Sequence, residues 1–554
     1  MRSLALIALA CSCLVGGAAT CAAADAPTIQ RLPGEDILAW IQIPDLKRLV
    51  EHVEATADRF AGAVGQEAPL ADLFGQVFGE AEMKALAADA PIALLVFAPA
   101  QGATEPDGAW FFPVSDATPL LALAGRFNQH AAAVGNLVLV ADTPARLERA
   151  KAFVPTWQAL AAAPADADIR IHLALARAMQ QWGPMAEMGI GVLAAAAAAQ
   201  NPDQGAQISS LLTLEMHGLM HVMKQIEDVQ IDLSTGAERC DVRVHLGATT
   251  GSPLAGVLAT VPAGVNEAGR LLSPGPAMMA MEGRFDGLAL GRLVEDVLDH
   301  LTAKPATKAL MLPETVATLK PAMVGWGGAM AMRMDFAADG ALATEVVASV
   351  RDPAVGQALI DACTTLLAAD GAIGRMYREA GIAFQIQPAA REHAGVPVHR
   401  LFTDLDATKI DAEQAQLMQS FLSDTDFAIA DGWYLSSSEP AGLDALIDRA
   451  RPGAAPVGGP NLKAVARHGA GQGMYMDYDM AALFGAMMAR FMPGAPAGPA
   501  AGSGDPVTAA MRWADGVGAY ELRVPYTPIV ELIQAAQKHA APEGEPVVDE
   551  APTF

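Results

Sequence analysis

Cysteine is scarce in this sequence, with five among 554 residues. Three of them, Cys11, Cys13 and Cys21, fall in an N-terminal segment that we expect to be removed, which leaves Cys240 and Cys363. These two could form one disulfide in an oxidising compartment. Because Cys240 belongs to a predicted strand and Cys363 to a predicted helix of a different repeat, we favour two thiols that pack as small apolar side chains.

Positive charge is also scarce. The chain has 36 Lys and Arg against 62 Asp and Glu, and its formal net charge is −26. Such a surface repels phosphate backbones and anionic lipid, so nucleic acids and acidic membrane surfaces are poor candidates for partners. A simpler role for the acidic residues is to keep the protein soluble.

The apolar runs of the sequence are too short to span a bilayer, and the first of them, Leu4–Gly17, predicts a targeting segment instead. With Arg2 before this run and the small residues Ala22-Ala23-Ala24 after it, we predict a signal peptide over residues 1–24. Residues 25–31 then form a short N-terminal segment, with no transmembrane segment in the mature chain. The predicted location is outside the cytoplasm, either periplasmic or extracellular.

Familiar catalytic and cofactor motifs are missing. The chain contains no Gly-x-Ser-x-Gly, no Ser-x-x-Lys and no phosphate-binding loop that ends in Gly-Lys. Gly189-Ile190-Gly191 followed by Ala194 imitates a dinucleotide-binding fingerprint, but no predicted strand precedes it, so we interpret it as the start of an alanine-rich helix. We therefore expect no cofactor, and the sequence favours a protein that is not an enzyme.

The chain does have a large apolar content, 52% of its residues, and one recurring local pattern. Val229–Ala263 contains two alternating strands around a Ser-Thr-Gly turn, followed by a short apolar helix that begins at a Ser-Pro pair. The same strand, turn, strand and helix recur at Met330–Leu359 and at Met511–Ala535, with Asp-Gly turns. Antiparallel hairpins need further strands and a packed helix to be stable, so the fold class is α+β.

Five segments, each a strand or a hairpin followed by a helix, correspond in the same order between the two halves of the chain. We therefore predict two tandem pseudo-repeats, residues 32–263 and 273–540, each with antiparallel sheets and helices packed on one face. Residues 541–554 form a tail rich in Pro and Glu that we expect to be disordered. The first repeat carries an additional helical region, Met185–Gln225, and the second carries an additional pair of strands within Ile373–Leu405. Strand order does not follow from these patterns.

Three short segments resemble an uncharacterised family of exported bacterial proteins, a domain of unknown function. The first is Leu32–Val50, LPGEDILAWIQIPDLKRLV. The others are Asn136–Leu147, NLVLVADTPARL, and Gly395–Leu401, GVPVHRL. The resemblance implies export, and it implies no activity and no site residues.

The strongest candidate for a metal site is the pair His217 and His221, which a spacing of four places on one helical face. Gly218 occupies the position where zinc proteases have their glutamate base, so protease chemistry is not supported. Met216, Met220 and nearby methionines could favour a soft ion such as copper. In a chain with 25 methionines, filling of the core is the simpler explanation.

From these observations we predict an exported binding or scaffold protein of unknown partner, which holds an apolar ligand or a protein partner. The alternative is a metal-binding protein or metal-dependent hydrolase that uses His217 and His221. The two hypotheses differ at one residue, because only the second predicts that replacing His217 by alanine releases a bound ion.

Overall fold

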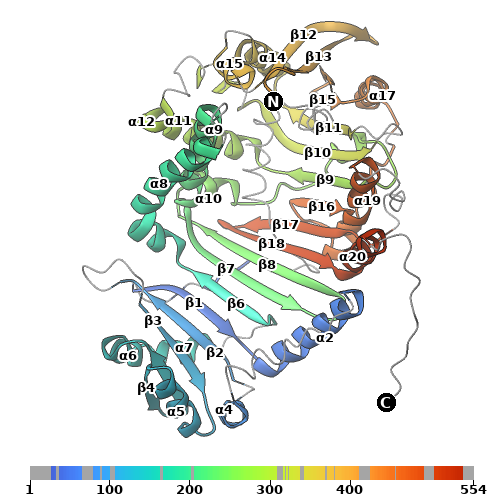
Figure 1. The fold of residues 1–554 in the computed structure, drawn as a ribbon. Helices are drawn as coiled ribbons and strands as arrows, with labels where there is room; N and C mark the ends of the chain where they lie inside the picture. Colours follow the sequence, from blue (N-terminus) through green and yellow to red (C-terminus); the bar gives the residue numbers. More distant parts are fainter. Residues whose placement is uncertain are drawn as a thin grey trace, which may run out of the picture.

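A computed structural model shows one large mixed structure of helices and antiparallel strands (Figure 1). The structure describes residues 27–540 except 31, 33–35, 65–78, 88–89, 100–106, 162–165, 201–204, 309–315, 318–319, 322–323, 337–341, 369–370, 380, 411–423, 456 and 492–503. The predicted α+β class is confirmed. The predicted signal peptide, residues 1–24, and the predicted tail, 541–554, lie outside the described residues.

Eighteen strands form a single continuous sheet, where the sequence favoured separate sheets in two repeats. From one edge, the strands of the first half are β4 (His130–Val134), β5 (Leu137–Ala141), β3 (Asp107–Pro113), β2 (Ile92–Phe97), β1 (Ile37–Ile43), β6 (Ile169–Leu173), β7 (Ile226–Thr235) and β8 (Arg239–Ala248). The sheet continues through β18 (Val517–Pro525), β17 (Val507–Ala514), β16 (Met474–Tyr478), β9 (Met279–Arg284), β10 (Trp326–Phe336), β11 (Leu342–Val350), β15 (Trp433–Ser437), β14 (Thr425–Ala430), β13 (Val396–Leu405) and β12 (Ile382–His393). All of these pairings are antiparallel.

The order of strands is the same in both halves when it is followed outward from the central β8–β18 pair. The first half continues through β7, β6, β1, β2, β3, β5 and β4, and the second through β17, β16, β9, β10, β11, β15 and β14. Two more strands, β13 and β12, extend the second half. A duplicated chain would give this order, but order alone does not establish common descent, so the duplication stays a prediction.

The helices pack on both faces of the sheet, and the prediction of helices on one face is wrong in this respect. In the first half, alternate residues of β5 enter two separate hydrophobic clusters: Leu139 packs with helix α6, while Val138 packs with helix α5 on the opposite face. The second half repeats this arrangement, with α17 on one face and α14 on the other. Strands that are buried on both faces need apolar residues at every position, which explains why β5 reads Leu-Val-Leu-Val.

The helices connect these strands, and several begin at the polar residues that the sequence indicates. Asp286 caps α11 by accepting hydrogen bonds from the backbone N–H groups of Leu288 and Ala289. Gly287 allows α11 to begin directly against β10, because a Cβ atom there would overlap the carbonyl oxygen of Trp326. The helices are α2 (Leu46–Val64), α4 (Glu80–Ala85), α5 (Thr118–Arg126), α6 (Pro144–Lys151), α7 (Val154–Ala161), α8 (Leu175–Gln200), α9 (Gly205–Met223), α10 (Pro253–Val257), the 3₁₀ helix Gly269–Leu271, α11 (Gly287–Ala303), α12 (Pro305–Lys308), α14 (Pro353–Leu367), α15 (Ala372–Glu379), α17 (Pro440–Ala450), α18 (Lys463–His468), α19 (Met480–Phe491) and α20 (Tyr526–Ala540).

Among the described residues, no helix combines the length and the apolar content that a membrane crossing requires.

Candidate functional site

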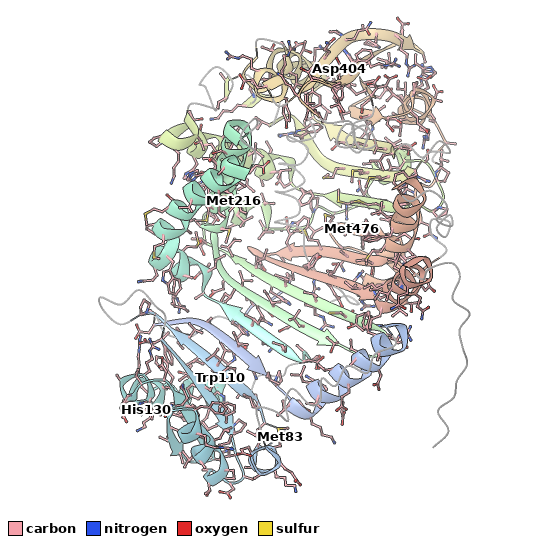
Figure 2. The ribbon with its side chains drawn as sticks, in the orientation of Figure 1. Met83, Trp110, His130, Met216, Asp404 and Met476 are labelled. Atoms are coloured by element: carbon pink, nitrogen blue, oxygen red, sulfur yellow. The ribbon has the colours of Figure 1, made fainter. Side chains whose placement is uncertain are left out.

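The histidines that the sequence singles out lie in a layer of three helices, α8, α9 and α11, beside the centre of the sheet (Figure 1). Helix α9 carries His217 and His221, and Figure 2 labels Met216, which precedes them. Helix α11 packs against α9, and its apolar side chains, such as Leu293 and Val297, belong to the largest hydrophobic cluster. Helix α11 therefore anchors this layer of helices to the sheet.

His221 contacts two residues of the neighbouring helix α11. Its Nε2 lies 2.6 Å from Oδ2 of Asp296 on α11, and its ring stacks on His300 with 3.9 Å between ring centroids. Gln225 donates a second hydrogen bond to the same oxygen of Asp296, at 2.7 Å, and accepts one from the backbone N–H of Leu254. This network fixes the end of α9 to α11 and α10.

His217 faces a different environment. Its side chain is 7% exposed, and its Nδ1 has no hydrogen-bond partner among the described residues. Burial lowers the pKa of His217, and the positive charge of Lys304 lowers it further. Within the described part of the chain, no three His, Cys, Asp or Glu side chains are placed to hold a metal ion. The described residues thus do not gather around His217 and His221 the further His, Cys, Asp or Glu ligands of a typical protein metal site.

Glu187 ties α8 to the other two helices. Its carboxylate accepts hydrogen bonds from Nζ of Lys224, at 2.6 Å, and Nζ of Lys304, at 2.7 Å. The hydrogen bond from Lys224, followed by that from Lys304, lowers the pKa of Glu187 to about 2. Burial lowers the pKa of His300 to about 4, and the neighbouring His221 and the positive charge of Lys304 add to this effect. We call Glu187, Lys224 and Lys304 the clamp.

Beyond the clamp, α8 presents apolar side chains to solvent. Met185, Met188, Val192 and Leu193 are 52%, 67%, 70% and 56% exposed. The opposite side of the helix is buried, as Ile190 and Ala194 show. A water-exposed helix face normally carries charged or polar side chains, and this one does not.

The scarcity of charge extends over the whole hairpin of α8 and α9. Between Met188 and Leu214 the sequence contains one charged residue, Asp203. An alanine-rich helix is predicted here, and the structure shows that one side of it packs against α9. The side that is left exposed carries Met185, Met188 and Val192, whose spacing repeats every three and four residues. We call the exposed residues Met185, Met188, Val192, Ala195, Ala196 and Ala199 the α8 face.

Several buried carboxylates in and beside the sheet are paired internally. Three buried carboxylates, those of Asp168, Asp232 and Asp426, each bind one or two arginines; these are Arg48, Arg170, Arg391 and Arg400. Asp168 also lies 2.9 Å from Nδ1 of His52. Such pairings stabilise buried carboxylates and offer no free group for catalysis.

One buried arrangement has the residue types of a nucleophile, a base and an acid. Nε2 of His468 lies 3.1 Å from Oγ1 of Thr508, and Nδ1 of His468 lies 3.6 Å from Oε2 of Glu521. All three residues are fully buried, and α18, which ends at His468, packs on β17, which carries Thr508. A substrate has no access to Thr508, so the arrangement supports the packing of α18 on the sheet. The sequence gives no sign of it, because the three residues are far apart in the chain.

No protein-family model matches the chain, and no curated protein or solved structure shows significant similarity to it. The resemblance of Leu32–Val50 and the other two segments to exported bacterial proteins stays a prediction.

Proposed function

We propose that this protein is a non-enzymatic binding or scaffold protein, exported from the cytoplasm, and that the α8 face is its binding surface. The observation that carries this proposal is the exposure of Met185, Met188 and Val192 on a helical hairpin that is almost free of charge. Large exposed apolar side chains that gather on one face are typical of sites for apolar ligands or protein partners.

The energetics of burial favour this role. Covering one large apolar side chain contributes about 1.5–3 kcal/mol, so three or four of them on one face can drive association without charged contacts. The clamp supports the same role, because it fixes the base of α8 and so reduces the entropy lost on binding.

The non-enzymatic part of the proposal is supported by the internal pairing of buried carboxylates described above. The export part is supported by the sequence of residues 1–24. The alternative that uses His217 and His221 as metal ligands lacks the support of a cluster of three His, Cys, Asp or Glu side chains in the described residues.

Titration with Nile red, a neutral apolar dye, tests the binding surface. We expect the native protein to bind the dye and Met188→Gln to bind it several-fold more weakly. The matched control is Leu288→Gln, which removes a similarly exposed apolar side chain, 53% exposed, from α11. Equal dye binding by all three proteins would show that the α8 face is not the apolar binding surface. Native mass spectrometry of the purified protein would then report whether a ligand is held elsewhere.

A further inference from the structure

The arrangement of residues along α8 points to one occupant of the α8 face, a second copy of this chain. We propose that two copies associate through antiparallel packing of α8 against α8, about a two-fold axis that passes beside Val192. This inference rests on the proposed role of the α8 face as a binding surface, and it names the partner.

The spacing of the α8 face is that of a helix that packs on another helix. Met185, Met188, Val192, Ala195 and Ala199 are separated by three, four, three and four residues. This is the a and d repeat of a coiled-coil seam, which keeps side chains directed at a partner helix over successive turns. At 1.5 Å per residue the seam is roughly 21 Å long.

The distribution of side-chain size along the seam is complementary to itself in the antiparallel direction. The methionines lie at one end and the alanines at the other, with Val192 midway. A two-fold axis beside Val192 places Met185 level with Ala199 of the second copy, and Met188 level with Ala196 of the second copy. Each large side chain then meets a small one, so the distance between helices can stay constant along the contact. A two-fold interface requires this self-complementarity.

The distribution of charge also favours a second copy of this chain as the partner of the α8 face. A chain with a net charge of −26 repels its own copy wherever acidic residues would face each other. The α8 face carries no charged residue, and the nearest carboxylate, that of Glu187, is neutralised by Lys224 and Lys304. Helix α8 also lies at the outer side of the molecule (Figure 1). The two copies can therefore meet there without facing like charges.

Sedimentation velocity over a range of concentrations tests the proposal. A seam of this length buries less area than a standard interface, so we expect a dissociation constant on the order of tens of micromolar. Val192→Glu places two carboxylates against each other at the axis and should weaken dimerisation at least tenfold. The matched control is Leu193→Glu, which adds the same charge about 100° around the helix and should leave dimerisation nearly unchanged.

Disulfide formation supplies a second measurement. Val192→Cys brings two thiols together at the axis, so an added oxidant should produce a covalent dimer, whereas Leu193→Cys should give little. The native protein, whose Cys240 thiol is free and partly buried, serves as the background. Circular dichroism of each variant confirms that it is folded.

The outcomes separate this inference from the proposed function. A native protein that binds Nile red but stays monomeric at every concentration would overturn the dimer and leave the binding surface in place. Equal loss of dimer in Val192→Glu and Leu193→Glu, or equal crosslinking at the two positions, would also overturn it. A protein that neither dimerises nor binds the dye through Met188 would overturn both.

Discussion

The two halves of the sheet carry different additions. The first half inserts the hairpin of α8 and α9 between β6 and β7, where the described residues of the second half form helix α19 between β16 and β17. The second half extends the sheet with β12 and β13, where the first half ends at β4. Figure 2 labels Asp404 on this second addition and Met216 on the first, at separate places on the molecule.

The two additions are held in place by different physical means. Charge fixes β12 and β13, because Arg391 and Arg400 both bind the buried carboxylate of Asp426. The hairpin of α8 and α9 is held at its base by the clamp, and beyond it the exposed side is apolar. This contrast indicates that β12 and β13 complete the fold, while the hairpin is available for binding.

The largest effect in this comparison should follow from Asp426→Asn. The carboxylate of Asp426 is 2% exposed and accepts hydrogen bonds from both Arg400 and Arg391. Loss of its charge leaves Arg400 without this counter-ion and Arg391 with Asp444 alone, which should lower the free energy of unfolding by about 3 kcal/mol. Urea denaturation followed by circular dichroism measures this change.

The control for this prediction is Asp448→Asn on the same part of the molecule. Asp448 is 55% exposed and pairs with His393, so its loss should change the free energy of unfolding by less than about 0.5 kcal/mol. If the two variants unfold at the same urea concentration, charge does not hold β12 and β13 in place.

Glu187→Gln should have an intermediate and local effect on the hairpin. The substitution weakens two charged hydrogen bonds, to Lys224 and Lys304, and should favour local opening of α8 by about 1–2 kcal/mol. Hydrogen exchange measured by mass spectrometry should show faster exchange in α8, with β12 and β13 unchanged. Glu148→Gln, which removes one exposed pair with Lys151, is the control and should leave α8 unchanged.

Glu187→Gln should also change how the stability of α8 depends on pH. Because the pKa of Glu187 is about 2 in the folded protein, below its ordinary 4.5, the clamp contributes its full stability above pH 4.5. That contribution is lost as pH falls from 4.5 toward 2, when the folded protein must bind the proton. Glu187→Gln should lack this part of the pH dependence. If hydrogen exchange in α8 depends on pH in the same way in Glu187→Gln and in the native protein, Glu187 does not hold the helix.

Local signals in the sequence predict the elements well, because caps and turns act over a few residues. Asp45 caps α2 through the backbone N–H of Arg48, and Thr143 caps α6 through that of Arg146, as the polar residues at those positions indicate. The hairpins at Val229–Ala263 and Met511–Ala535 also form at the predicted places. These features determine the α+β class.

Long-range pairing could not be predicted in the same way. The centre of the sheet joins β8 to β18, where Val244 lies opposite Tyr520, and no local pattern selects that partner. The ion pair of Arg170 with Asp232 likewise depends on the register of β6 against β7. For the candidate site, the sequence contains the spacing of Met185, Met188 and Val192, but only the packing of α9 shows which side of α8 is left exposed.

The smallest effect should come from His217→Leu, which separates the roles of the two histidines on α9. His217 is buried with an unpartnered Nδ1, so an apolar side chain of similar size removes an unsatisfied polar atom and should change stability by less than about 1 kcal/mol. The variant should also keep the metal content and dye binding of the native protein, because the α8 face does not include this residue. Inductively coupled plasma mass spectrometry of both proteins, purified without chelator, measures the metal content. If the native protein holds a stoichiometric ion that His217→Leu loses, this expectation is contradicted and α9 is a metal site. If the metal content of the two proteins is equal, α8 stays the proposed binding element of the α8 and α9 hairpin.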